Sequence, residues 1–228
     1  MRRIPFDITG LSYDEFVFFL FGREVPQESF TTLAARGETA KWNPWYWNME
    51  VTGDVGPVCD YYIRLFNRPT FLPERYSAEQ LEQGFWAVQT LNLRCSAHSL
   101  IWNTDVPFEA RADCIRAMYP LFRELFANRS LENSVCMWWD SFCYAWDCGN
   151  RKRSRGGEDL AMQDVMFETL VDILAVDSEI CQGAALHGLS HLHHPSTQSA
   201  IESYLKRNPS LNDEWKKIAL GVSRFDLM

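Results

Sequence analysis

Residues 177–209 read DSEICQGAALHGLSHLHHPSTQSAIESYLKRNP, and this stretch has the pattern of two short helices joined by a tight turn. Apolar residues recur at helical spacing along one face of the first half, and Pro195 ends that helix because its ring removes a backbone donor. The second half repeats the pattern until Asn208 and Pro209, and a third helix is expected from Ser210 onward. Short helices with one apolar face each cannot bury those faces alone, so they must pack on neighbouring helices.

The same segment resembles a HEAT-type repeat. The features that carry the resemblance are the Ala-Leu-x-Gly-Leu-x-x-Leu run that begins at Ala185, the proline in the turn, and the short second helix. The resemblance covers the C-terminal part of the chain, and it implies a HEAT/armadillo-like α-solenoid in which antiparallel helix pairs are stacked. Repeats of this kind serve many functions, so it speaks to architecture alone.

The rest of the chain is also read as helical. Ser12 with Glu15, and Ser77 with Gln80, form capping boxes that predict two helix starts. Further helices are expected over 58–66 and 95–102, over 107–127 with a kink at Pro120, over 131–146 at the centre of the molecule, and over 158–176. No segment shows a convincing period of two. The sequence thus predicts one all-α domain over 1–228, in which an irregular, aromatic-rich part (1–75) caps a repeat-like part (76–228).

Composition narrows the class of protein. The chain has 228 residues, 46% of them hydrophobic, and a formal net charge of −8. That charge opposes non-specific binding to nucleic acid or to anionic membranes and favours a basic protein partner. The seven cysteines are odd in number and form no Cys-x-x-Cys pair, which indicates free thiols in a reducing compartment. A cytoplasmic protein without a membrane span is expected.

Four histidines gather at positions 187, 191, 193 and 194. His187, His191 and His194 follow helical spacing, and a His-x-x-x-His pair on one helix face can bind one Zn²⁺ with a third ligand from elsewhere. Glu168 or Asp172 on the preceding helix is the acidic ligand that the sequence suggests. The alternative is that the histidines are ordinary polar residues on an exposed helix edge. That alternative is preferred, so no metal, cofactor or catalytic residue is assigned.

A second candidate site is the aromatic cluster of Trp42, Trp45 and Trp47, which lies in an irregular segment. Clustered aromatic side chains on a loop can anchor a protein partner or stack on a sugar. They can also pack down and close the open end of the core, and this second interpretation is favoured.

The densest basic cluster comprises Arg151, Lys152, Arg153 and Arg155. No aromatic residue is interleaved with it, and acidic residues follow it directly at Glu158 and Asp159. The cluster is therefore interpreted as a solvated loop between two helices.

Three functional hypotheses remain open. The leading one is a non-enzymatic binding or scaffold module that presents a helical face to a protein partner, because no catalytic motif accompanies the repeat-like tail. The second is a metal-dependent enzyme built around His187 and His191. The third is an acidic inhibitor or immunity-type protein that blocks a basic target.

Overall fold

The computed structural model describes residues 3–26, 28, 30–41, 43–128, 131 and 133–224, and it is mostly helical. Two short strands, β1 (Ile4–Asp7) and β2 (Met49–Thr52), accompany the helices near the N-terminus. The α-helices are α1 (Tyr13–Phe21), α2 (Phe30–Ala35), α3 (Gly56–Asn67), α4 (Leu72–Arg75), α5 (Ala78–Gln89), α6 (Ala97–Ile101), α7 (Phe108–Arg116), α8 (Met118–Glu124), α9 (Trp138–Asp147), α10 (Gly157–Leu174), α11 (Glu179–Leu192), α12 (Thr197–Arg207) and α13 (Asp213–Ser223).

The strands are a departure from the predicted all-α fold. β1 and β2 pair in parallel, with Ile4 opposite Met49 and Asp7 opposite Thr52. Met49 and Val51 are buried while the two residues that alternate with them are exposed, so the period of two is present in β2. It spans only four residues, which is too short to distinguish a strand from a loop in the sequence.

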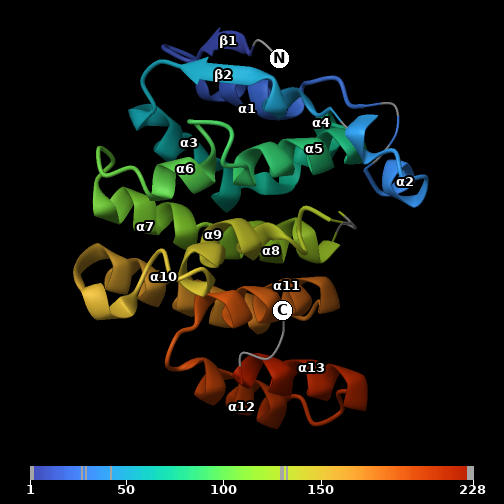
Figure 1. The fold of residues 1–228 in the computed structure, drawn as a ribbon, viewed down its shortest axis with the longest axis vertical. Coiled ribbons are helices and arrows are strands. Elements are labelled where there is room, and N and C mark those ends of the chain that lie inside the picture. Colours follow the sequence, from blue (N-terminus) through green and yellow to red (C-terminus); the bar gives the residue numbers. More distant parts are fainter. Residues whose placement is uncertain are drawn as a thin grey trace.

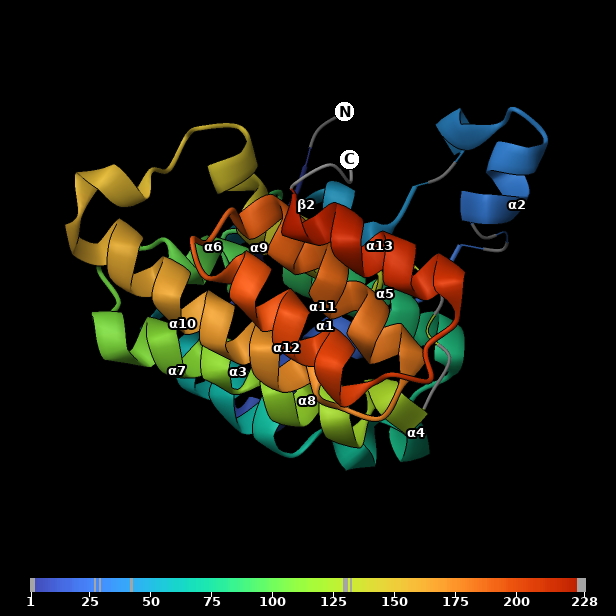
Figure 2. The ribbon, with the colours of Figure 1, turned by 90° about the horizontal axis from the view of Figure 1, so that it is seen from below.

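The elements are stacked as layers along the long axis of the molecule, in the order of the chain (Figure 1). The β1–β2 pair and α1 lie at one end, and α12 and α13 lie at the other. In the middle, α3 packs on α7, and α11 packs on both α9 and α10. The end view shows α2 standing apart from this stack (Figure 2). The site described below lies where α9 and α11 meet.

The expected helix over 107–127 is divided into α7 and α8. The Ala117 N–H still donates to the Asp113 carbonyl at 2.9 Å, but the next intact bond, from the Leu121 N–H to the Ala117 carbonyl, is stretched to 3.5 Å. Pro120 has no N–H to offer the Arg116 carbonyl, which explains the break at this point. The kink predicted from the sequence is therefore a boundary between two helices.

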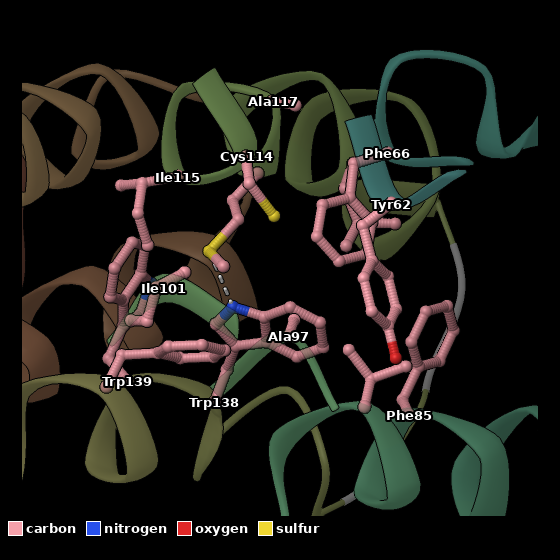
Figure 3. Close-up of a cluster of buried hydrophobic side chains, with 14 of the residues drawn as sticks. Tyr62, Phe66, Phe85, Ala97, Ile101, Cys114, Ile115, Ala117, Trp138 and Trp139 are labelled. Carbon is pink, nitrogen blue, oxygen red and sulfur yellow. Dashed lines mark hydrogen bonds between the residues drawn. The ribbon is translucent and has the colours of Figure 1, made fainter. Parts of the chain in front are cut away.

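The aromatic core lies against α9 (Figure 3). Trp138 and Trp139 are both fully buried, as expected for a central helix, and the Trp138 indole N–H donates to the Met118 sulfur at 3.2 Å. The helix begins at Trp138 rather than at the predicted Leu131, because a turn precedes it. The Glu82 carboxylate holds that turn by accepting from the backbone N–H and the hydroxyl of Ser134, at 2.7 and 2.8 Å.

The three C-terminal helices occur close to their predicted positions. α12 packs mainly on α13, and a hydrogen bond of 2.8 Å from the Tyr204 hydroxyl to the Gln182 side chain links α12 to α11. The first of the three, α11, has its largest contacts with α9 and α10. The layered arrangement of helices is thus established, whereas a regular repeat of α11–α12 pairs is not defined by these contacts.

Among the described residues, no helix is both long and apolar enough to cross a bilayer. All seven cysteines are free, and five of them are buried, while Cys136 and Cys148 are exposed. The expectation of free thiols is confirmed, and most of them serve as small apolar groups in the core.

Candidate metal site

Gly188 brings α9 and α11 close together. A Cβ placed on Gly188 would lie 2.6 Å from the Cβ of Trp139 and 2.7 Å from a methyl group of Leu170. Any side chain at this position would therefore push the helices apart. Gly188 directly follows His187, and Trp139 directly precedes Asp140, so the close approach sets the histidine next to the carboxylate.

Three side-chain atoms from these two helices converge. His191 Nε2 lies 2.9 Å from His187 Nε2 and 2.9 Å from Asp140 Oδ1, and His187 Nε2 lies 3.4 Å from Asp140 Oδ1. The two histidines are one helical turn apart on α11, as their spacing predicts. Asp140 is in the first turn of α9. Among the described residues, these three form the group of possible metal ligands.

A hydrogen bond at Nδ1 determines which ring nitrogen of His187 is protonated. His187 Nδ1 lies 3.1 Å from the backbone carbonyl oxygen of Cys136, which can only accept a hydrogen bond. Nδ1 must therefore carry the proton, and in the neutral ring Nε2 offers its lone pair to the other two groups. This is the tautomer that a metal ligand needs.

The outer nitrogen of His191 faces a second carboxylate. His191 Nδ1 lies 3.7 Å from Asp147 Oδ2, and the other oxygen of Asp147 lies 2.9 Å from His193 Nε2. Carboxylates in this outer position orient metal-binding imidazoles in many proteins. Asp147 ends α9, so one helix supplies both the inner and the outer carboxylate.

A proton holds the group together when no metal is bound. The hydrogen bond to Asp140 raises the pKa of His191, and the same bond to His191 lowers the pKa of Asp140. Burial opposes both shifts but is the smaller effect for each residue. A proton on His191 Nε2 satisfies the two acceptors beside it, and a cation placed between the three atoms would replace that proton.

The spacing of the three atoms fits a transition-metal ion. A triangle with sides of 2.9, 2.9 and 3.4 Å has its corners on a circle of radius about 1.8 Å. A point about 1 Å outside its plane is then about 2.05 Å from every corner, which is the usual zinc–nitrogen and zinc–oxygen distance. Donor atoms of a regular tetrahedral zinc site are about 3.3 Å apart, so the two pairs at 2.9 Å would have to separate by a few tenths of an ångström.

One side of the triangle is open to solvent. The His191 side chain is 11% exposed, whereas those of Asp140 and His187 are 27% and 32% exposed. Structural zinc sites are closed by four protein ligands, and catalytic sites keep one position for water or substrate. Three ligands with an exposed face match the second kind of site.

A cleft of about 680 Å³ adjoins the site, and Asp140 lies in its wall. Tyr144, one turn further along α9, also lines the cleft and contacts the His191 ring edge-on with 6.0 Å between ring centroids. A volume of this size is sufficient for a small organic molecule. The carboxylate that faces the two histidines is therefore accessible from the cleft.

Arg151 and Arg155 also line the cleft. The Arg151 guanidinium lies 3.3 Å from the centroid of the Trp102 ring and 2.6 Å from the Asp159 carboxylate. The basic cluster lies between α9 and α10 with Lys152 and Arg155 exposed, as expected, but Arg153 forms an ion pair with Asp164. The cluster is fixed by ion pairs and ring contacts, which direct two of its arginines to the cleft.

Other predicted site residues lie elsewhere. The αL conformation of His193, with φ of +52°, ends α11 and takes His194 off the histidine stripe. His194 is buried against Phe167 and bonded to Asp164 at 2.9 Å. Glu168 and Asp172, the acidic ligands suggested from the sequence, are exposed on α10, and Asp140 takes the expected place.

The described tryptophans of the predicted aromatic cluster differ in their exposure to solvent. Trp42 lies outside the described residues. Trp45 is half-buried and packs edge-on against Phe19 at 5.2 Å, whereas Trp47 is 43% exposed. The Arg23 guanidinium also covers the Trp45 ring at 5.4 Å. Trp45 thus packs down onto α1, in the manner expected of a residue that closes the core.

Comparison of the chain with protein-family models, with curated proteins and with solved structures finds no match.

Proposed function

We propose that the protein binds one divalent transition-metal ion, with zinc preferred, at Asp140, His187 and His191, and that it is a metal-dependent enzyme. The observation that carries this proposal is the convergence of the three ligand atoms at 2.9–3.4 Å across two helices. The two imidazoles are borderline nitrogen donors, and a site with two of them and one carboxylate suits zinc better than calcium or magnesium.

The reaction class that fits the open position is hydrolysis. A zinc ion with three protein ligands lowers the pKa of a bound water to about 7, so a hydroxide nucleophile is present at neutral pH. His187 and His191 would hold the ion as neutral ligands, and Asp140 would contribute one negative charge from the side of the cleft. Asp147 would orient the His191 ring.

Metal analysis tests the site directly. Protein purified without an affinity tag is stripped with a chelator, reloaded with zinc and dialysed, and its zinc content is measured. We expect one zinc ion per chain in the parent protein. Asp140→Asn and His187→Ala should weaken zinc binding at least as much as loss of an outer-shell partner does, which is roughly 10–100-fold.

Asp172→Asn is the matched control, because it makes the same chemical change on an exposed helix face next to α11. It should leave zinc content unchanged. Equal zinc content in Asp140→Asn and Asp172→Asn would show that the site is wrong. Hydrolysis of an activated ester by the zinc-loaded protein, lost in Asp140→Asn, tests the reaction class.

A binding or scaffold module of α-solenoid type is the second candidate. The layered helices support it, since a stack of helical layers presents helices along its sides (Figure 1). The net charge of −8 favours a basic protein partner, which is also the requirement for the acidic inhibitor hypothesis. Co-purification of a basic partner with metal-free protein, equally well with Asp140→Asn, would favour this candidate over the enzyme.

A further inference from the structure

Without a metal ion, the charged side chains that line the cleft balance one another. The charged residues in its wall are Arg151, Arg155, Asp140 and Asp159. His98 also lines the cleft, and burial together with the nearby charge of Arg151 lowers its pKa to about 4, so it is neutral at pH 7. Two positive and two negative charges remain. A divalent ion on Asp140 would leave the cleft with an excess of two positive charges.

The two arginines differ in how firmly they are held. Arg151 is fixed by the Trp102 ring and by Asp159, and its side chain is only 26% exposed. Arg155 is 58% exposed, donates to the Asn150 carbonyl at 2.7 Å, and is 3.9 Å from Asp159. A guanidinium has five N–H donors, so Arg155 keeps several of them for a ligand in the cleft.

The wall of the cleft also contains apolar side chains, which indicate that its ligand has an organic group. Leu91 and Trp102 lie in the wall together with the aliphatic Ala145. They provide a surface for an organic group beside the charged end of the cleft.

We propose that the cleft binds an organic phosphate monoester, with its dianionic phosphate between the metal position at Asp140 and the guanidinium of Arg155. This inference rests on the proposed metal site. A phosphate dianion matches the excess of two positive charges, whereas a carboxylate matches only half of it. Arginine also pairs with phosphate through parallel hydrogen bonds, which suits the exposed face of Arg155.

The test is calorimetric titration of the zinc-loaded protein with two probes that share a ring, phenyl phosphate and benzoate. Phenyl phosphate should bind more tightly than benzoate. Arg155→Gln should weaken phenyl phosphate binding about tenfold, as expected for loss of a charge-assisted hydrogen bond. Arg116→Gln is the control, because Arg116 is similarly exposed but lies on α7 in a pair with Asp113.

The outcomes separate this inference from the metal proposal. Parent protein that takes up no zinc contradicts the metal site, and with it the phosphate site. Zinc-loaded protein that binds phenyl phosphate no better than benzoate overturns the phosphate inference alone. Equal binding by Arg155→Gln and Arg116→Gln, at unchanged zinc content, overturns it as well.

Discussion

Gly188 faces Trp139 with no room for a methyl group between them: a Cβ on Gly188 would lie 2.6 Å from the Trp139 Cβ and 2.8 Å from its Cγ. These are not the ends of flexible side chains, so the backbone of α9 or α11 would have to shift. Because each of the two residues is adjacent to a proposed ligand, the packing of the core and the geometry of the site depend on the same contact.

Gly188→Ala should therefore impair both stability and metal binding. Overpacking of this kind costs about 1–3 kcal/mol of unfolding free energy, and separation of the helices would move Asp140 away from the histidines. Gly183→Ala on the same helix is the control, since its Cβ would meet only the Trp215 ring at an ordinary 3.5 Å. Urea unfolding and zinc titration of both variants measure the two effects, and identical behaviour of the two would contradict the close contact.

Zinc should stabilise the folded protein, because only the folded chain brings Asp140 to the histidines. With free zinc at 100 times its dissociation constant, the gain in unfolding free energy should be about 2.7 kcal/mol. A chelator should reverse the gain. The measurement is urea unfolding with and without zinc, and His191→Ala should show no zinc-dependent difference. A gain of the same size in that variant would place the metal elsewhere.

His98 should make the protein less stable in acid. Its pKa is lowered to about 4 by burial and by Arg151, whereas in the unfolded chain it is near the ordinary 6.5. Between these two values the unfolded chain binds a proton that the folded chain does not, so stability falls as the pH falls from 6.5 to 4. Below about pH 4 the loss reaches its limit, at roughly 3 kcal/mol.

The contribution of His98 is obtained by comparing the parent protein with His98→Phe. Unfolding free energies measured between pH 7 and pH 4 should fall less steeply in the variant. The difference of slopes is the quantity to test, because the carboxylates of both proteins titrate alike. Parallel curves would mean that the pKa of His98 is not lowered by folding.

Trp139 should be among the costliest side chains to truncate. It is fully buried between the aromatic core and α11, so Trp139→Ala should lower the unfolding free energy by about 3–5 kcal/mol. Trp47→Ala, at a site that is 43% exposed, should cost less than about 1 kcal/mol. Denaturant unfolding of the two variants provides the comparison, and a small loss for Trp139→Ala would contradict its central position.

Local features of the fold could be predicted from the sequence, and non-local ones could not. The capping box of Ser12 and Glu15 is formed as expected, with the Ser12 N–H bonded to the Glu15 carboxylate at 2.8 Å. Its members are three residues apart, so the pattern is complete in the sequence. The β1–β2 pair joins segments far apart in the chain, and neither strand shows its partner in advance.

In the candidate metal site, too, the local feature could be predicted from the sequence and the non-local one could not. The spacing of His187 and His191 predicted that they share one helix face, and the structure places their Nε2 atoms 2.9 Å apart. Asp140 was missed because it stands among large aromatic residues on another helix, and Glu168 was nearer in sequence. One signal was available: Asp140 is a lone carboxylate directly after two buried tryptophans, where a polar side chain needs a partner.

The position of α9 before α11 in the chain has a consequence during protein synthesis. The ribosome releases the Asp140 segment well before the two histidines emerge, so a nascent chain lacks the pair that would share a cation with that carboxylate. Only when α11 docks, with Gly188 against Trp139, do all three donors come within reach. A bound ion would then stabilise the packing of α11 on α9. Metal binding by the new chain would therefore indicate that α11 has packed on the rest of the molecule.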